Sequence, residues 1–325
     1  MANNVLKVNG IAIADIAKIN GQNDADLAKL NGEEFVSAFG GITWSTDDTV
    51  PASGGGGKFG NVGAQGFTNG ISKATYEHNG SSWSTTGSTS GEHDVGGGGG
   101  TQGAAVIFAG WDGTAGDDIA VTEEYDGSSW SSANNMVQSC AFCTGGGVLQ
   151  TAQMVTGGSQ YNPTVRDLKM TQTYNGTNWS NESVDSTGLQ TGSCGESGGG
   201  GLDAFFIAGG ALESPGVVGT SQIFNQSASS WTSKASMSLE ARYVTSATDG
   251  TRVYKIGGYD APAFTQTAVV ESWVENTWTT QTSMPAGIRQ GGNGTGGAEA
   301  SGGAACVAGA GSGGATNSYF IAAAS

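Results

Sequence analysis

The amino-acid sequence predicts an all-β fold, a closed six-bladed β-propeller over residues 39–325 that follows a short anchor segment of helices and turns over residues 1–38. Three observations support this fold: a motif that recurs along the chain and ends in tryptophan, glycine in long runs, and two incomplete motifs at the chain ends that complement each other. Internal repeats of this length are typical of propellers and solenoids.

The recurring motif has the same parts in the same order in six segments. A glycine run is followed by an apolar strand, a variable loop, a strand with an aromatic residue, a polar turn and a tryptophan, and residues 96–130 are the clearest copy. The turn tryptophans are Trp44, Trp83, Trp130, Trp179, Trp231 and Trp278. Their intervals of 39, 47, 49, 52 and 47 residues match the roughly 40–50 residues of a four-stranded blade.

Each part of the motif has a physical reason. Asp126-Gly127 and the matching Asn-Gly pairs supply the positive φ angles of a two-residue hairpin turn. Glycine runs suit the innermost strands, because neighbouring blades crowd around the axis and leave little room for Cβ atoms. We expect each turn tryptophan to wedge between two blades and to bury a large apolar area there.

The two chain ends are expected to build the sixth blade together. Residues 291–297, 304–309 and 319–321 supply three strands without a tryptophan, whereas residues 41–45 form an outer-strand segment with Trp44 and lack the strands that should precede it. Joining them completes a blade and leaves no open sheet edge, which is how propellers avoid edge-to-edge aggregation.

Composition and charge exclude several classes of protein. The chain has 58 glycines and 5 prolines, but its 8 Trp, 8 Tyr and 11 Phe recur at regular places, which indicates a globular rather than a disordered chain. With 28 acidic against 12 basic residues, its net charge of −16 disfavours nucleic acid and anionic membrane as partners. The sequence shows no signal peptide and no apolar run approaching the roughly 20 residues of a membrane span.

The first 35 residues carry a different repeat, with a period of 11 residues: Lys7-Val8-Asn9-Gly10, Lys18-Ile19-Asn20-Gly21 and Lys29-Leu30-Asn31-Gly32. We expect short helices that end at each Asn-Gly pair, too short to be stable alone. They therefore need a surface, and the candidate anchoring residues are Ile11, Ile13, Ile16, Ile19, Leu27 and Leu30. The alternatives are a disordered leader or a strap on the propeller's own side.

The sequence offers no convincing catalytic set. His78 and His93 are expected on the surface, and they do not form the His and Tyr set that a copper oxidase needs. The acidic pairs Asp47-Asp48, Asp117-Asp118 and Glu123-Glu124 are adjacent, so their side chains point to opposite faces of a strand. The sequence therefore predicts no enzyme, no catalytic residue and no cofactor.

Two metal sites remain open as alternatives to that expectation. The loop from Asp112 to Asp118 has the oxygen ligands that calcium prefers. Cys140 and Cys143 have the spacing of half a zinc site, which Cys194 and Cys306 would complete. Small buried cysteines in a tightly packed core explain the same pattern, and we expect no metal.

The better site candidates lie in loops. Loops between the second and third strands and the connections between blades share one face of a propeller, and here these loops vary in length and combine aromatic with polar residues. This character suits carbohydrate or protein binding. The candidate ligand- or host-binding residues are Trp111, Asp112, Tyr161, Tyr259 and Asp260. Ordinary loop variation without a ligand is the alternative.

These motifs resemble known proteins. Residues 96–102, five glycines followed by Thr-Gln, and residues 123–130, ending in Tyr-Asp-Gly-Ser-Ser-Trp, are similar to repeats of marine phage virion proteins and to kelch-type propeller blades; residues 149–152 match part of the same pattern. The resemblance covers most of the chain. It implies a kelch-like fold, but kelch propellers serve enzymes, adaptors and lectin-like modules alike.

The leader resembles those that open structural proteins of marine phages. Leader and propeller together imply a non-enzymatic virion protein, a tail fibre, knob or capsid decoration. Residues 1–38 would attach it to other tail or capsid proteins, and the exposed propeller would contact a host-surface glycan or protein. A homo-oligomer within the particle is expected. The chief alternative is a cellular kelch-type protein- or carbohydrate-binding module, and an oxidase or lyase on the same fold is the third.

Overall fold

The computed structural model of the 325-residue chain describes residues 57–61, 64–161, 166–182, 205–212, 216–248 and 252–287 (except 262 and 275), with Pro51 and separate strands elsewhere. The chain divides into two units, Met1–Gly41 with Ala324–Ser325, and Ile42–Ala323. Among the described residues, none belongs to a helix of the length and apolarity needed to cross a bilayer.

The smaller unit contains three hairpins that recur with the 11-residue period, and each strand of these hairpins is two residues long. They pair β1 (Lys7–Val8) with β2 (Ile11–Ala12), β3 (Lys18–Ile19) with β4 (Gln22–Asn23), and β5 (Lys29–Leu30) with β6 (Glu33–Glu34). The prediction of helices is therefore wrong for these segments. Each Asn-Gly pair connects two strands rather than ending a helix, which agrees with its strong preference for tight hairpin turns. Ile11, Ile19 and Leu30 lie in these strands, whereas Ile13, Ile16 and Leu27 lie outside the described residues.

The larger unit is an all-β propeller with at least four ordered blades. Its described strands include five four-stranded antiparallel sheets. Sheet 1 contains β8 (Lys58–Asn61), β9 (Ala64–Thr68), β10 (Ala74–His78) and β11 (Trp83–Ser88), and sheet 2 contains β12 (Gly97–Thr101), β13 (Ala104–Phe108), β16 (Thr122–Tyr125) and β17 (Trp130–Ser132). Sheet 3 contains β18 (Thr144–Leu149), β19 (Ala152–Thr156), β22 (Thr171–Tyr174) and β23 (Trp179–Asn181).

Sheet 4 contains β24 (Cys194–Ser197), β25 (Phe205–Ala208), β26 (Ser221–Asn225) and β27 (Ser230–Lys234), and sheet 5 contains β29 (Thr245–Thr248), β30 (Val253–Ile256), β32 (Val270–Val274) and β33 (Thr277–Thr280). A further sheet contains, in this order, β34 (Ala304–Ala308), β35 (Ser318–Ala324) and β7 (Ile42–Thr49). It therefore joins strands from the two chain ends, as predicted, while residues 291–297 lie outside the described residues.

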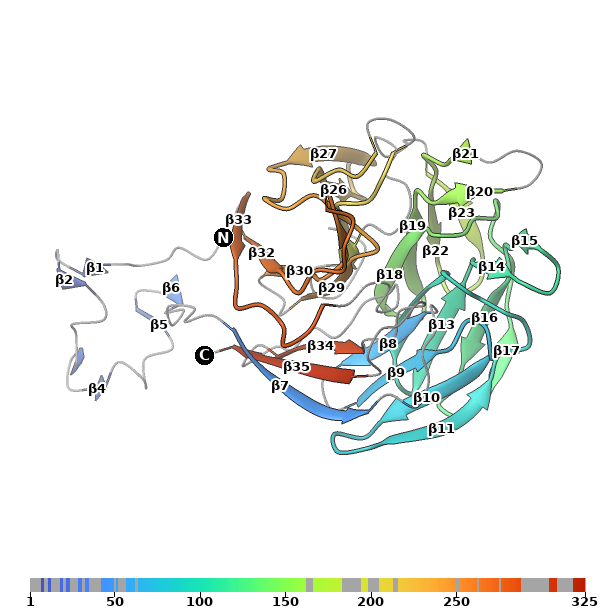
Figure 1. Cartoon of the computed structure of the whole chain (residues 1–325), viewed down its shortest axis with the longest axis horizontal. Coiled ribbons are helices and arrows are strands. Elements are labelled where there is room, and N and C mark those ends of the chain that lie inside the picture. Colours follow the sequence, from blue (N-terminus) through green and yellow to red (C-terminus); the bar gives the residue numbers. More distant parts are fainter. Residues whose placement is uncertain are drawn as a thin grey trace. The chain divides into compact units, whose positions relative to one another are not determined.

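The innermost strands follow one another in chain order. β8, β12, β18, β24, β29 and β34 each contact the next, and Figure 1 shows the sheets succeeding one another in the same order within the larger unit. Glycine is required where these strands meet: a Cβ atom on Gly99 would lie 2.5 Å from the carbonyl oxygen of Gly147, and one on Gly98 would lie 3.0 Å from Cα of Gly57. The expected reason for the glycine runs is confirmed at these positions.

The turns before Trp83, Trp130 and Trp179 have four residues, two more than predicted, whereas two residues separate β32 from β33 before Trp278. Tyr125 pairs with Trp130 across the turn, and Gly127 has a φ of 90°. The Oδ1 atom of Asp126 accepts hydrogen bonds from the backbone N–H groups of Ser129 (2.8 Å) and Ser128 (2.9 Å). The backbone of Ser129 and the hydroxyl and backbone of Ser128 lower the pKa of Asp126 to about 2. The first turn residue therefore shapes the loop through its side chain.

Four of the turn tryptophans lie between sheets, as predicted. Trp130 Nε1 donates to Oγ1 of Thr75 in the preceding sheet at 2.7 Å, and Trp179 Nε1 donates to Oγ1 of Thr122 at 2.9 Å. Two further bonds repeat this arrangement at 3.1 Å and 3.2 Å, from Trp231 to Thr171 and from Trp278 to Ser221. Each hydroxyl belongs to a third strand, so every indole connects the outer strand of one sheet to the third strand of the sheet before it.

The Thr-Gln motif also has a structural role. Gln102 Nε2 donates to the carbonyl oxygen of His78 at 3.0 Å, and Gln150 Nε2 donates to the carbonyl oxygens of Ala105 (2.8 Å) and Tyr125 (3.0 Å). Both glutamines lie in the turn between the first two strands of a sheet. They therefore bind the backbone of the preceding sheet at its opposite end from the variable loops.

Candidate ligand-binding face

The variable loops lie beside the connections that lead into their own sheets. β28 (Ala241–Arg242), in the connection before sheet 5, pairs with β31 (Tyr259–Asp260) in the loop after β30. Backbone bridges from Asp94 to Trp111 and from Ala141 to Ser159 repeat this arrangement in sheets 2 and 3. The prediction that the two kinds of loop share one face is confirmed for these sheets.

Aromatic side chains form two groups of ring contacts on this face. Trp111 and Tyr161 meet edge to face at 5.3 Å between ring centroids, Phe142 lies 6.2 Å from Tyr161, and Tyr243 lies 5.9 Å from Phe142. Farther along, Tyr259 lies 6.1 Å from Phe264. We call these six residues the aromatic belt: Trp111, Tyr161, Phe142, Tyr243, Tyr259 and Phe264. The belt includes all three aromatic residues predicted for the site.

Arg242 connects the two parts of the belt. Its guanidinium carbon lies 5.0 Å from the ring centre of Tyr243 and 5.7 Å from that of Tyr259. Both distances fall within the range of cation–π contact. The belt therefore carries a positive charge in a chain whose net charge is −16.

Two belt residues are among the most exposed large apolar side chains of the described chain. Tyr161 is 37% exposed and Phe264 is 52% exposed. Their rings have no full covering of protein, although exposure of this size costs free energy in water. The other four belt residues are half-buried, so the belt is a supported surface with ring area available to a ligand.

The two predicted aspartates shape loops. Asp112 Oδ1 accepts hydrogen bonds from the backbone N–H groups of Thr114 (2.8 Å) and Ala115 (2.9 Å). Asp260 Oδ1 accepts from the N–H (3.0 Å) and the hydroxyl (3.1 Å) of Thr265. Both carboxylates therefore hold the loops that present belt residues. A direct role for Asp112 or Asp260 in ligand binding stays a prediction.

Both histidines are buried, and their predicted surface location is wrong. His78 is 1% exposed and takes the place of the aromatic residue that faces the turn tryptophan, with its ring centroid 5.0 Å from that of Trp83. His93 is fully buried; its Nδ1 lies 2.8 Å from the carbonyl oxygen of Ala109, and its Nε2 lies 3.2 Å from Oε1 of Glu123. His78 takes the place of an aromatic core residue, and His93 connects the backbone at Ala109 to Glu123. The sequence around each histidine does not reveal these roles.

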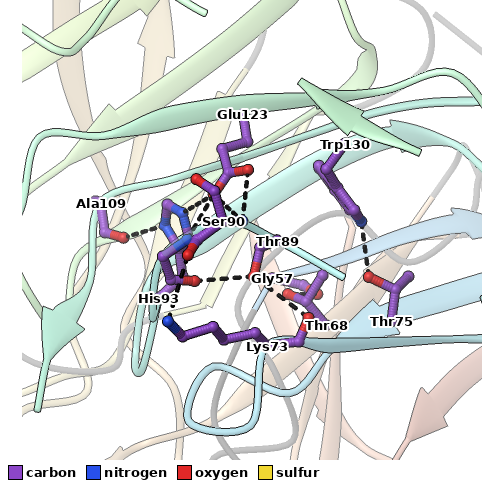
Figure 2. A network of polar contacts seen from close by, with 11 residues as sticks. Gly57, Thr68, Lys73, Thr75, Thr89, Ser90, His93, Ala109, Glu123 and Trp130 are labelled. Carbon is purple, nitrogen blue, oxygen red and sulfur yellow. Dashed lines mark hydrogen bonds and ion pairs between the residues drawn. The ribbon is translucent and has the colours of Figure 1, made fainter. Parts of the chain in front are cut away.

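Glu123 fixes the connection between sheets 1 and 2, as Figure 2 shows. Its carboxylate accepts hydrogen bonds from the N–H groups of Ser90 (2.9 and 3.0 Å) and Gly91 (3.2 Å) as well as facing His93. Burial alone would raise the pKa of Glu123, but the bonds from His93, Ser90 and Gly91 outweigh it and lower that pKa below its ordinary value. The neighbouring Glu124 accepts from the hydroxyl of Tyr174 at 2.9 Å, so the two carboxylates serve different partners.

The equivalent position in other sheets has the same role. Gln172 Oε1 accepts from the N–H of Val137 at 2.8 Å, and Glu271 accepts from the N–H groups of Ser238 (2.9 Å) and Leu239 (3.3 Å). In each case the buried side chain holds the connection that enters its own sheet. These buried side chains hold the connections of the loop face in place and are not exposed to a ligand.

The metal alternatives find little support in the described residues. Asp118 Oδ1 accepts from the N–H of Tyr161 at 2.6 Å and its Oδ2 from the hydroxyl of Ser139 at 2.9 Å, so its oxygens already have donors. Cys140 and Cys143 are buried and do not form a disulfide with each other, and burial, the hydrogen bond to Cys143 and the nearby charge of Asp118 raise the pKa of Cys140. Within the described part of the chain, no cluster of three His, Cys, Asp or Glu side chains could hold a metal ion.

Sequence reasoning did not find Phe142, Tyr243, Arg242 and Phe264. Phe142 and Tyr243 each precede the first strand of a sheet by two residues, and both have positive φ angles, 54° and 53°. This left-handed conformation is uncommon for bulky residues, and propensity alone does not predict it. Alignment of the repeats at their first strands would have placed both residues at one position.

Comparison with known proteins supports the assignment of the fold. No known protein family matches this sequence, and no curated protein is similar to it. The solved structure of YjhT, a kelch-repeat protein, is similar with a TM-score of 0.68 and 13% sequence identity, over 84% of this chain and 95% of that one. At this identity the similarity concerns the fold alone. The chain is thus similar to kelch-type β-propellers in its architecture.

Proposed function

We propose that this chain is a non-enzymatic phage virion structural protein, a tail fibre, knob or capsid decoration, whose propeller binds a glycan on the host surface through the aromatic belt. The virion role rests on the resemblance of the leader and the repeats to marine phage proteins. The binding role rests on the belt. Residues 1–38 would attach the protein to tail or capsid partners, as one copy of a homo-oligomer.

The exposed rings of Tyr161 and Phe264 are the observation that favours a saccharide. One face of a pyranose presents C–H groups that pack on an aromatic ring, while its hydroxyls stay at the rim within reach of polar groups. The carboxylates that hold the belt loops at Asp112 and Asp260 supply acceptors nearby. A rigid aromatic surface with polar borders matches this chemistry.

The described residues favour binding over catalysis. Glu123 and His93 bind each other and the backbone of one connection, and Cys140 is a buried thiol with a raised pKa. General acid–base and nucleophilic catalysis need such groups within reach of a substrate. Here they lie inside the fold, and the exposed face carries rings.

We further propose that the propeller has six kelch-like blades, with β34, β35 and β7 forming part of the sixth. Trp44 supports this count, because its indole forms a hydrogen bond equivalent to one formed by the indole of Trp278. Trp278 Nε1 donates at 2.8 Å to the carbonyl oxygen of Ala235, four residues after Trp231. Trp44 Nε1 donates at 2.8 Å to the carbonyl oxygen of Thr282, four residues after Trp278. By this rule Trp44 belongs to the blade that follows sheet 5.

Replacing Trp44 by alanine is expected to destabilise the propeller by about 2–3 kcal/mol. The expected loss is below the ~3–5 kcal/mol of a fully buried tryptophan, because Trp44 is only half-buried. Urea unfolding followed by fluorescence measures the change, and limited proteolysis should find new cleavage near β7. Trp44→Phe is the control, which keeps most of the apolar contact and loses the bond to Thr282. A midpoint unchanged in Trp44→Ala would count against closure by this strand.

Replacing Tyr161 by alanine tests the binding role. We expect a glycan array or host-cell binding assay to show about three- to tenfold weaker binding, since an aromatic contact contributes roughly 0.5–1.5 kcal/mol. Leu149→Ala is the matched control: Leu149 is 47% exposed but lies at the end of β18 away from Phe142. Equal losses in both variants would contradict a site on the belt.

The virion role needs a separate experiment. Full-length protein and a variant without residues 1–38 are compared for incorporation into purified particles. Incorporation of the full chain at fixed stoichiometry and its loss in the shortened variant are expected. A protein that binds glycan but is absent from particles would instead be a cellular kelch-type binding module.

A further inference from the structure

Arg242 has the surroundings of a recognition residue. It lies in β28 and pairs in register with Tyr259 of β31, and its guanidinium lies near the rings of both Tyr243 and Tyr259. Contacts of this kind favour Arg, whose planar group packs on aromatic rings. They occupy the apolar side of the group, and the N–H donors at its edges need acceptors.

Those donors are not fully used by the described residues. Arg242 Nε is buried from solvent and has no hydrogen-bond partner within the described part of the chain, where Arg242 also forms no ion pair. The Oδ1 atom of the adjacent Asp260 accepts two hydrogen bonds from Thr265. A buried N–H without an acceptor costs about 1–3 kcal/mol. Because protein covers Nε, an acceptor brought by a ligand would bind the two terminal nitrogens of the guanidinium.

The positive charge of Arg242 indicates which kind of acceptor group a ligand would bring. The chain contains 28 acidic residues, yet Arg242 remains without a carboxylate partner among the described residues while it connects both parts of the belt. A planar guanidinium binds a carboxylate through two parallel hydrogen bonds. At physiological ionic strength the Debye length is about 8 Å, so the charge of Arg242 acts on a bound ligand more strongly than carboxylates beyond that distance do.

We propose that Arg242 is the anion-recognition residue of the belt and that the preferred ligand is a carboxylate-bearing saccharide. The guanidinium edge binds the carboxylate, and the pyranose ring packs on the neighbouring rings of Tyr243, Phe142 and Tyr161. This inference rests on the proposed glycan-binding function and specifies its ligand class. It assigns charge selection to Arg242 and ring stacking to the aromatic residues.

The test uses the full chain and an array of hexuronic acid oligosaccharides, each paired with its carboxyl-reduced counterpart, in which CH₂OH replaces the carboxylate. We expect the wild-type protein to bind the acidic member at least tenfold more tightly. Arg242→Gln should bring the two members of each pair within about twofold without weakening the neutral one. Arg242→Lys should keep part of the preference, because it retains the charge and loses the planar fork.

Lys234→Gln is the matched charge control, because it removes one positive charge from the outer strand β27 and should leave the preference unchanged. Circular dichroism of each variant checks that the fold is kept. Equal binding of acidic and neutral members by the wild-type protein would overturn the role of Arg242 and leave glycan binding standing. If no saccharide of the array binds, the proposed function and this inference both fail.

Discussion

Replacing Glu123 by alanine is expected to cost about 3–5 kcal/mol of unfolding free energy, because it leaves several buried donors without an acceptor and each such donor costs about 1–3 kcal/mol. The substitution leaves His93 Nε2 and the N–H groups of Ser90 and Gly91 without their acceptor. The connection between sheets 1 and 2 should then open locally. Urea unfolding measures the loss, and hydrogen exchange at Ser90 and Gly91 locates it.

Glu123→Gln is the control, because Gln172 performs the same role one sheet later. We expect this variant to lose only about 1 kcal/mol, the net value of a hydrogen bond. A loss in Glu123→Ala no larger than in Glu123→Gln would contradict the assigned role.

The stability difference between the wild-type protein and Glu123→Gln is expected to depend on pH. The folded-state pKa of Glu123 lies below its ordinary value of 4.5, so its contribution to stability is present above that value and is lost as the pH falls through the lower folded-state pKa. The stability difference between wild type and Glu123→Gln should therefore shrink below about pH 4.5.

Replacing Trp179 by alanine is expected to cost about 3–5 kcal/mol as well. Trp179 is only 7% exposed, its ring lies 4.9 Å from that of Phe108 in the preceding sheet and 5.1 Å from that of Tyr174, and its indole donates to Thr122. The substitution leaves a cavity between sheets 2 and 3. Thermal and urea unfolding midpoints measure the effect.

Trp179→Phe separates packing from hydrogen bonding. It keeps an aromatic ring against Phe108 but removes the bond to Thr122 Oγ1, so we expect a smaller loss of about 1–2 kcal/mol. A loss below about 1 kcal/mol in Trp179→Ala would mean that the tryptophan does not join the two sheets as described.

The sequence was most informative where one local signal repeats. Trp130 and Trp179 each occur after an Asx-Gly turn, so period and chemistry together located the outer strands and the interfaces between sheets. The glycine runs gave the crowded inner strands for the same reason. A repeated position averages out the ambiguity of any single residue.

Features without such a signal were missed or misassigned. The Asn-Gly pairs near Lys7 and Lys18 suit both a helix end and a hairpin, and strand pairing decides for the hairpin. His93 is a lone residue in a connection, and only its distance to Glu123 shows that it belongs to the core. The belt joins Trp111 and Tyr161 to residues of other connections, and such contacts depend on tertiary structure that no local pattern encodes.

The bond from Trp44 to Thr282 also has a consequence for how the protein matures on the ribosome. The two residues are separated by 238 positions, and β7 lies in a sheet with β34 and β35, which are synthesised after Thr282. At ~5–20 residues per second, β7 waits roughly 10–50 s for these neighbours to be synthesised. During that time an unpaired strand that carries a tryptophan is open to other chains. Nascent copies made on one messenger can therefore pair with each other's β7 until their own β34 and β35 have been synthesised.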